Sequence, residues 1–207
     1  KISIGAVENL QGISWQKIIV YGEANHAGTT PIRLRKDAGY VTAKIITFLR
    51  DLVNNSNGTT VATIGTISFE PNAINVIPSK STFTVDLRDP NEEKLKSAEK
   101  ALKNYLEKLR TEERMKIETE RLVRFLPVTF NERIVKIIEK VAKDKNYSCR
   151  RMTSGAGHDA QMMSRICPTA MIFVPSYKGI SHNPAEFTED EDLLKGTSVL
   201  LDVVTKL

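Results

Sequence analysis

The sequence predicts an α/β protein built in two parts, and two observations support this prediction. Over residues 12–125, apolar residues alternate or recur at helical spacing in the order strand, helix, strand, strand, helix, strand. From Leu126 onward, short and continuously apolar strands alternate with helices, which is typical of a sheet buried on both faces. We therefore expect one domain over residues 12–125 and part of a second domain over residues 1–11 and 126–207.

The first half of residues 12–125 predicts a strand, a helix and a second strand. Residues 14–24 are β-branched and alternate roughly in polarity, as in a strand. After the loop NHAGTTP, residues 37–53 predict a helix, because their apolar side chains share one face: Val41, Ile45, Phe48, Leu49 and Leu52. The segment NNSNG ends this helix, and residues 59–71 (TTVATIGTISFEP) predict one continuous strand.

The second half predicts a third strand, a second helix and a fourth strand. After the turn NAINVIP, the segment STFTVDLRDP alternates cleanly at Phe83, Val85 and Leu87. Residues 92–109 predict a helix with one apolar face, formed by Leu95, Ala98, Leu102, Leu106 and Leu109. The segment MKIETERLV alternates as the last strand. This element order is that of a ferredoxin-like sandwich, in which four antiparallel strands carry two helices on one face.

The elements after Leu126 predict only a portion of an α/β domain. A helix is expected over residues 131–144, followed by a strand near residues 149–152. The turn SGAGHDA opens a short helix, and PTAMIFVP predicts a continuously apolar strand. The last helix begins near Glu189, where Thr188 and Glu191 match the capping-box pattern.

The composition argues against two classes of function. No apolar run approaches the roughly 18 residues that a membrane span requires, so we expect no membrane partner. The net charge of +5 and the pI near 9.1 raise the question of nucleic-acid binding. However, the basic residues are interleaved with acidic ones, as on solvated helix and strand faces. Because only SCRRM is locally basic and has no aromatic platform, we expect no nucleic-acid partner either.

The cysteines and the first residues suggest where the protein works. Cys149 and Cys167 form no CxxC pattern, which suggests buried thiols in a reducing compartment and therefore the cytoplasm. Neither has a histidine adjacent in sequence, so neither is a convincing nucleophile. The segment KISIGAVENLQGISW has neither an initiator Met nor the apolar core of a signal peptide, so we expect a piece of a longer protein.

All three histidines lie in loops rich in Gly, Ser, Asn or Pro rather than on apolar helix faces. His182, in ISHNPAE, fits a metal ligand as well as it fits a histidine bonded to its own turn. His26, in EANHAGTTP, is equally compatible with a simple turn residue. His158 follows Gly155 and Gly157 in a turn before a helix, where backbone N–H groups can bind a carboxylate.

Arg88 ends the alternating strand TFTVDLR and offers a second carboxylate-binding group. A guanidinium binds a carboxylate through two parallel hydrogen bonds, which lysine cannot do. The residues alone equally allow an ion pair with Asp86 or Asp89.

Several stretches, in this order along the chain, resemble one enzyme family: QGISW, GEANHAGTTPIRLRKDA, NVIP with TVDLRDP, SGAGHDAQ and ISHNPAEFT. They are similar to the N-carbamoyl-L-amino-acid hydrolases, which are related to allantoate amidohydrolase and to the metal-dependent β-alanine synthases. All of these belong to the co-catalytic metallopeptidase clan of aminoacylase and carboxypeptidase G. The resemblance spans nearly the whole chain.

The resemblance implies a domain assignment and a cofactor. Residues 12–125 match the family's lid and dimerisation domain, which is inserted into an α/β metallohydrolase catalytic domain. Residues 1–11 and 126–207 match the C-terminal part of that catalytic domain. The full-length enzymes bind two divalent metal ions, here zinc, manganese, cobalt or nickel, mostly through ligands upstream of the region that matches this chain. We therefore expect this chain alone to bind no metal stably.

The resemblance also implies roles for particular residues. His182 matches the single C-terminal metal ligand, and His26 matches a catalytic histidine that reaches the neighbouring subunit's active site to stabilise the oxyanion. Asn75 and Arg88 match the pair that binds the α-carboxylate of the substrate. The turn with Gly155, Gly157 and His158 would contact the substrate, and His158 and Asp159 would either bind it or support residues that do.

Two functional hypotheses from different classes follow. In the first, the chain is the C-terminal portion of a homodimeric amidohydrolase that cleaves the carbamoyl C–N bond of N-carbamoyl-L-amino acids or related small ureido acids. In the second, it is a non-catalytic dimerisation module, because the lid is complete whereas the metal-ligand set is not.

Overall fold

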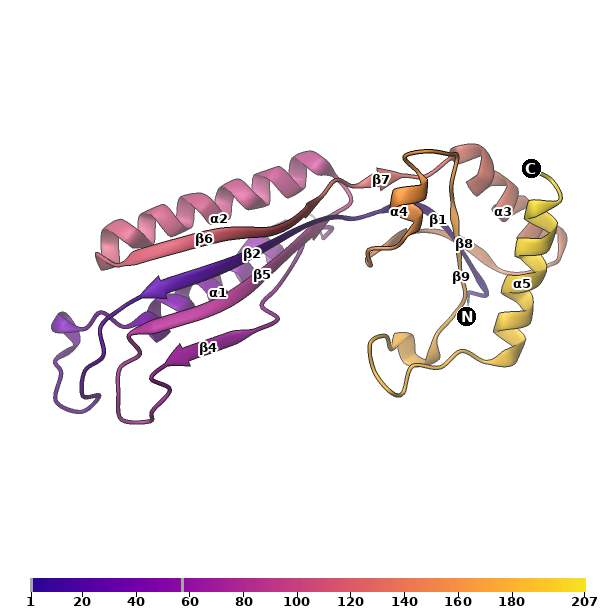
Figure 1. The fold of residues 1–207 in the computed structure, drawn as a ribbon. Helices are drawn as coiled ribbons and strands as arrows, with labels where there is room; N and C mark the ends of the chain where they lie inside the picture. The colour runs from indigo at the N-terminus through magenta and orange to yellow at the C-terminus, as the bar shows by residue number, and fades with distance from the viewer. Residues whose placement is uncertain (1, 57) are drawn as a thin grey trace. The chain divides into compact units, whose positions relative to one another are not determined.

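The computed structural model describes residues 2–56 and 58–207 and divides the chain into two compact units. The antiparallel unit is Gly12–Pro127, and the mixed-sheet unit combines Lys1–Gln11 with Val128–Leu207. Each unit has its own sheet and its own apolar core (Figure 1). Lys1 of the expected segment 1–11 and Asn57 of the expected helix terminator lie outside the described residues.

The antiparallel unit has the predicted order of elements, with one predicted strand divided in two. Residues 59–71 form two short strands that both pair with β5, so the prediction of one continuous strand was wrong. Between the last residue of β3 and the first residue of β4, the chain has one residue more than the stretch of β5 that faces it. Gly65 lies in this irregularity of the pairing. The elements are β2 (Gly12–Tyr21), η1 (Ile32–Leu34), α1 (Ala38–Asn54), β3 (Val61–Thr63), β4 (Ile67–Glu70), β5 (Lys80–Asp89), α2 (Glu92–Glu113) and β6 (Lys116–Phe125).

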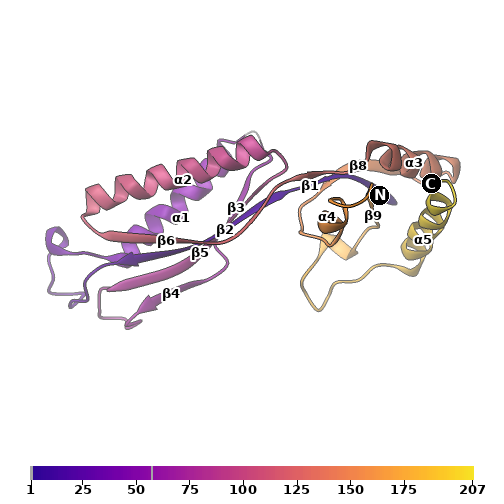
Figure 2. The same ribbon diagram turned by 45° about the horizontal axis from the view of Figure 1, so that its top comes forward.

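The sheet of this unit has the order β3–β5–β2–β6, with β4 also on β5, and all of these pairs are antiparallel. Helices α1 and α2 cover one face of it (Figure 2). The apolar residues of β5 alternate as predicted, and those of both helices pack against them. Asp37 and Asn91 cap α1 and α2 by accepting the backbone N–H groups of Tyr40 and Lys94.

The mixed-sheet unit is organised around a strand that the sequence did not reveal. Strand β1 (Ile4–Leu10) runs parallel to β8 (Cys149–Ser154) and antiparallel to β7 (Val128–Thr129) and β9 (Met171–Phe173). Its buried residues Ile4, Ala6, Val7 and Leu10 form the core together with residues of three helices. These are α3 (Glu132–Asp144), α4 (Ala160–Met163) and α5 (Asp190–Val204).

The start of α5 in the mixed-sheet unit corrects the sequence prediction. The capping box of Thr188 and Glu191 does not form, because α5 begins at Asp190 with Glu189 at the N-cap and no side-chain cap. Glu191 instead forms an ion pair with Lys195, one turn later, at 2.5 Å. The first turn of α5 contains three acidic residues, whose negative charges interact favourably with the positive end of the helix dipole.

The two cysteines differ in exposure, so only part of the prediction of buried thiols was correct. Cys149 is half-buried, and burial raises the pKa of its thiol. Cys167 is exposed, so the prediction was wrong for this residue. Among the helices of residues 2–56 and 58–207, none combines the length and the apolar character needed to cross a membrane.

Candidate functional site

The loop with His26 begins at the end of β2 and is held against a second loop of the same unit. Gly22 permits this geometry, because a Cβ there would lie 2.1 Å from the backbone oxygen of Lys36. The Ala27 N–H donates to the Asn75 carbonyl at 2.9 Å, and the Ile77 N–H donates to the Asn25 carbonyl at 2.8 Å. The structure therefore brings His26 and Asn75 together at one end of the sheet.

The ring of His26 has a defined hydrogen-bonding state. Its Nδ1 accepts the backbone N–H of Gly28 at 3.0 Å and that of Thr29 at 3.2 Å. A neutral imidazole has one donor and one acceptor nitrogen, so the proton lies on Nε2. The side chain is exposed, and this Nε2–H is therefore available to an anionic or carbonyl oxygen from outside the loop.

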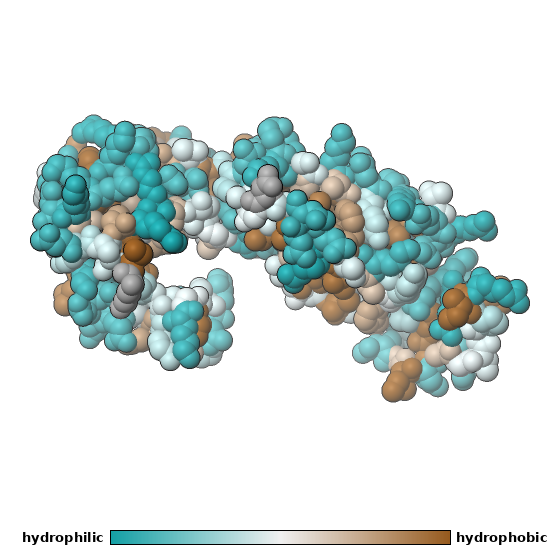
Figure 3. Space-filling view, turned by 180° about the vertical axis from the view of Figure 1, so that it is seen from behind, coloured by the Kyte–Doolittle hydropathy of each residue, from teal (hydrophilic) through white to brown (hydrophobic). Residues whose placement is uncertain are grey.

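The surface around His26 and Asn75 is apolar for a loop region. Ile32, Leu34 and Ile74 are all exposed, and Ile74 is fully so. Figure 3 shows hydrophobic residues at this end of the antiparallel unit, among largely hydrophilic ones. An exposed apolar group beside a hydrogen-bond donor is typical of a surface that contacts another molecule.

Arg88 pairs with Asp86, which is one of the two ion pairs that the sequence allowed. Its Nε and Nη2 donate to the Asp86 carboxylate at 3.0 and 2.7 Å. Asp89 is fully buried and has other partners, since it accepts the hydroxyls of Thr59 and Thr60. Arg88 and Asp86 lie on the face of β5 opposite the buried Leu87, about a quarter exposed.

The structure does not bring Asn75 and Arg88 together. Asn75 lies in the loop before β5, which starts at Lys80, whereas Arg88 is next to last in this strand. Eight residues of extended chain span about 26 Å at roughly 3.3 Å per residue. One small carboxylate cannot contact both side chains of the same chain, so the prediction that they act as a neighbouring pair was wrong within one copy.

The turn with Gly155, Gly157 and His158 lies at the carboxyl end of β8, next to the carboxyl end of the parallel strand β1. The Gln11 N–H donates to the Ser154 carbonyl at 3.1 Å, and His158 Nδ1 accepts the Ala160 N–H at 3.2 Å. Ligands of α/β sheets usually bind at this end of parallel strands. The following helix α4 has only four residues, so little of a helix dipole is available for a carboxylate.

His182 lies in the loop after η2 (Tyr177–Gly179), with a left-handed backbone of φ 56°. Its backbone N–H donates to Glu186 Oε2 at 2.9 Å, and the Ser181 hydroxyl donates to the other oxygen at 3.4 Å. The imidazole is exposed. No group of three or more His, Cys, Asp or Glu residues suited to a metal occurs in the described part of the chain, so His182 offers a single ligand.

One further residue of this region was missed by sequence reasoning. Arg35 donates two hydrogen bonds to carbonyl groups of the His26 loop. It stands in the stretch GEANHAGTTPIRLRKDA, but nothing in the spacing distinguishes it from Arg33. Only the path of the backbone through η1 reveals which arginine turns back onto the loop.

Comparisons with known proteins match nearly the whole chain to one family. Peptidase family M20/M25/M40 matches residues 6–206. N-carbamoyl-L-amino acid amidohydrolase of Geobacillus stearothermophilus is 37% identical over 206 residues, which are 100% of this chain and 50% of that protein. Allantoate amidohydrolase of Escherichia coli is 36% identical over 198 residues, or 96% of this chain and 48% of that protein.

A solved structure shares the fold of the whole chain. The amidase of the hydantoinase/carbamoylase family from Burkholderia multivorans superimposes with a TM-score of 0.95 and 32% identity, covering 99% of this chain and 50% of that chain. The chain thus spans about half the length of the relatives it matches. Because the family match extends over residues 6–206, the chain belongs to peptidase family M20/M25/M40.

Proposed function

We propose that the chain is the lid and the C-terminal part of the catalytic domain of a metal-dependent amidohydrolase. The reaction is hydrolysis of the carbamoyl C–N bond of N-carbamoyl-L-amino acids or related ureido acids. The observation that carries this proposal is the exposed Nε2–H of His26, held in place by two backbone N–H groups. Such a fixed donor suits the oxyanion that forms when water adds to a carbamoyl carbonyl, and the names of the relatives supply the substrate class.

The antiparallel unit is the proposed lid and dimerisation domain. Its strand order and its two helices on one face support the assignment to a ferredoxin-like sandwich. Strand β6 is ten residues long and lies at one edge of the sheet. An edge of this length can pair with the same edge of a second copy, which supports a homodimer.

The separation of Asn75 from Arg88 supports a site shared between two copies. In this proposal, His26 and Asn75 act in the partner's active site, where the partner's own Arg88 binds the other end of the substrate. The exposed apolar residues around His26 would then contact the partner. The substrate carboxylate would replace Asp86 as a partner of Arg88 or share its guanidinium.

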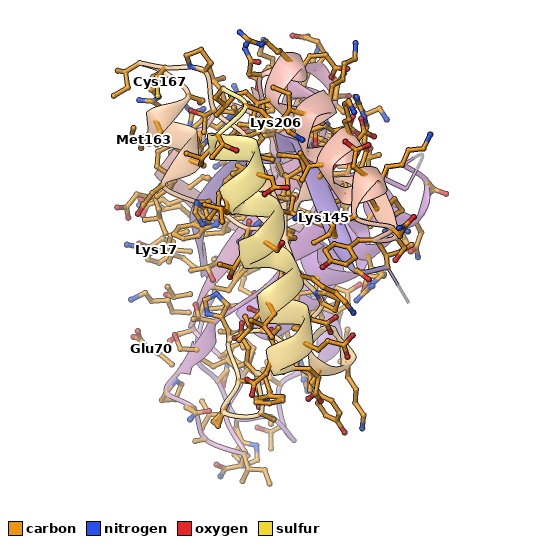
Figure 4. All side chains as sticks on the ribbon, turned by 90° about the vertical axis from the view of Figure 1, so that its right-hand side faces the viewer. Lys17, Glu70, Lys145, Met163, Cys167 and Lys206 are labelled. Carbon is orange, nitrogen blue, oxygen red and sulfur yellow. The ribbon has the colours of Figure 1, made fainter. Side chains whose placement is uncertain are left out.

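The mixed-sheet unit is the proposed C-terminal part of the catalytic domain. Helix α5 is apolar on its outward face as well as on its buried face, which is typical of a helix covered on both sides. In Figure 4, Met163 and Cys167 lie beside this helix, and both line an apolar groove with Ile134, Ile172, Leu200 and Val204. The rest of the catalytic domain would cover this surface.

The chain can supply only part of the ligands that two metal ions require. When bound, the metal pair supplies an activated hydroxide and polarises the scissile carbonyl. His182 would contribute one ligand, and its neutral imidazole suits zinc, manganese, cobalt or nickel. The turn with Gly155, Gly157 and His158 would orient the substrate. Since one ligand cannot hold two ions, this chain alone is expected to bind no metal stably and to be inactive.

A second candidate is a dimerisation module without hydrolase activity, favoured by the lack of a metal-ligand cluster in residues 2–56 and 58–207. The deciding experiment compares the full-length gene product with the 207-residue chain. Metal content and release of free amino acid from N-carbamoyl-L-amino acids are measured for both, with allantoate as a second substrate. Turnover by the full-length protein alone supports the proposal. No turnover by either protein favours the module, and turnover by the short chain contradicts the fragment assignment.

A further inference from the structure

Arg35 closes the loop that carries His26. It directly follows η1, and its part-buried guanidinium turns back toward the loop backbone. Nη2 donates to the Ala27 carbonyl at 2.6 Å, and Nε donates to the Thr30 carbonyl at 3.0 Å. Because a guanidinium is charged, both contacts are charge-assisted hydrogen bonds.

The first of these contacts reaches His26 through a single peptide group. The Ala27 carbonyl and the Gly28 N–H belong to the same planar trans peptide, so they point in opposite directions. On one side the carbonyl accepts from Arg35, and on the other side the N–H donates to His26 Nδ1 at 3.0 Å. A cation on the carbonyl polarises the peptide and strengthens its N–H as a donor.

The second contact fixes the far side of the loop. The buried Thr30 donates its hydroxyl to the His26 carbonyl at 2.7 Å, and its own carbonyl accepts from Arg35. The backbone that follows His26 is therefore tied to one guanidinium at two points, Ala27 and Thr30. Rotation of either peptide would remove a hydrogen bond from Nδ1 or from Arg35.

We propose that Arg35 is a positioning residue that keeps His26 in the Nε2–H form and directs this donor away from the loop. The role of the donor in carbamoyl hydrolysis rests on the proposed function, whereas the control of the tautomer rests on the contacts alone. Two N–H groups aimed at Nδ1 exclude a proton from that nitrogen, and Arg35 holds the first of them in place.

The tautomer can be measured without activity. Imidazole 15N chemical shifts of His26 are recorded in the 207-residue chain for the wild type, Arg35→Met, Arg35→Lys and the control Arg33→Met. We expect the Nε2–H form in the wild type and in the control, because Arg33 is an exposed neighbour. Arg35→Met should raise the population of the Nδ1–H form several-fold, and Arg35→Lys should lie between. Unchanged shifts in Arg35→Met would overturn the proposal.

Two further measurements keep the outcome decisive. If Arg35→Met fails to fold, judged by its amide spectrum, Arg35→Lys decides, and wild-type shifts in that variant overturn the proposal.

In the full-length enzyme, Arg35→Met should lower kcat by about tenfold or more with little change in KM, since an oxyanion donor acts in the transition state. A changed tautomer with an unchanged kcat contradicts the positioning role. Absence of carbamoyl hydrolysis in the wild type removes the proposed function, while the 15N shifts still decide what Arg35 does.

Discussion

The outward faces of the helices differ between the two units. In the antiparallel unit, every exposed residue of α2 is polar or charged, whereas its buried face is formed by leucines and an alanine. In the mixed-sheet unit, the outward face of α5 contains Leu194, Leu201 and Val204, each at least 60% exposed. Helix α2 therefore buries its apolar residues within its own unit, whereas α5 leaves part of its apolar residues available to another polypeptide segment. This difference indicates which unit can be stable alone.

The largest expected effect comes from truncating matched leucines in the two helices. Leu102→Ala, in the core of the antiparallel unit, should lower its free energy of unfolding by about 2–5 kcal/mol. Leu201→Ala, on the outer face of α5, should change the stability of the 207-residue chain by no more than about 0.5 kcal/mol. Urea unfolding followed by Trp15 fluorescence reports on the antiparallel unit, and amide exchange reports on the other.

The same pair of variants also tests the incompleteness of the mixed-sheet unit. In the full-length protein, Leu201→Ala should destabilise the catalytic domain by about 1 kcal/mol or more, because the side chain would then be buried. A loss of that size already in the 207-residue chain would mean that α5 is covered without the rest of the domain.

The histidines of the two units should separate metal binding from catalysis in the full-length enzyme. His182→Ala should lower metal content and activity together, and activity should fall by about a hundredfold or more. His26→Ala should leave the metal content unchanged and reduce kcat by about 10²–10³-fold, since it would remove the proposed oxyanion donor. Metal analysis and steady-state kinetics on both variants provide the comparison. Normal kcat in His26→Ala would return this residue to the role of a turn residue.

A smaller effect is expected from Arg88, where charge and shape are separable. Arg88→Lys keeps the charge but loses the two-point contact, so kcat/KM of the full-length enzyme should fall roughly ten- to a hundredfold. Arg88→Ala should lower it further and should discriminate little between a free acid and its amide. If the alanine variant still strongly prefers the acid, the turn at Gly155 and Gly157 is the carboxylate site.

The smallest effect is expected from pH, and it should occur in both units. The hydrogen bond from Arg151 lowers the pKa of Glu132 in the mixed-sheet unit, and that from Lys116 lowers the pKa of Glu118 in the antiparallel unit. With folded-state pKa values below the unfolded value near 4.3, both pairs stabilise at higher pH, and this contribution is lost as the pH falls through the folded pKa values.

Glutamine variants identify which unit responds to acid. Glu132→Gln should reduce the pH dependence of amide exchange below pH 5 in the mixed-sheet unit only, and Glu118→Gln in the antiparallel unit only. Since the pairs are exposed, 1 M salt should weaken both effects. An effect of either variant on the opposite unit would show that the two units unfold together.

Local periodicity predicted most of the antiparallel unit because its helices and its long strands are amphipathic, so residue spacing alone marks their buried faces. Phe83, Val85 and Leu87 alternate in the sequence and are buried in β5. The alternation cannot detect the irregularity between β3 and β4, because an extra residue is recognised only against a partner strand. Strand β1 was missed for another reason: its first four residues are all buried, so its side chains give no alternating pattern.

The sequence by itself determined the family resemblance, the order of the elements and the identity of the groups that can act: an imidazole in each of three loops, and an arginine at the end of a strand. These follow from residue type and spacing, which are local properties. The tertiary structure decided that His26 presents Nε2–H, that Arg35 rather than Arg33 closes its loop, and that Asn75 and Arg88 lie at opposite ends of one sheet. Hydrogen-bond partners and distances of this kind depend on where distant backbone segments meet, and no periodicity in a single chain encodes that.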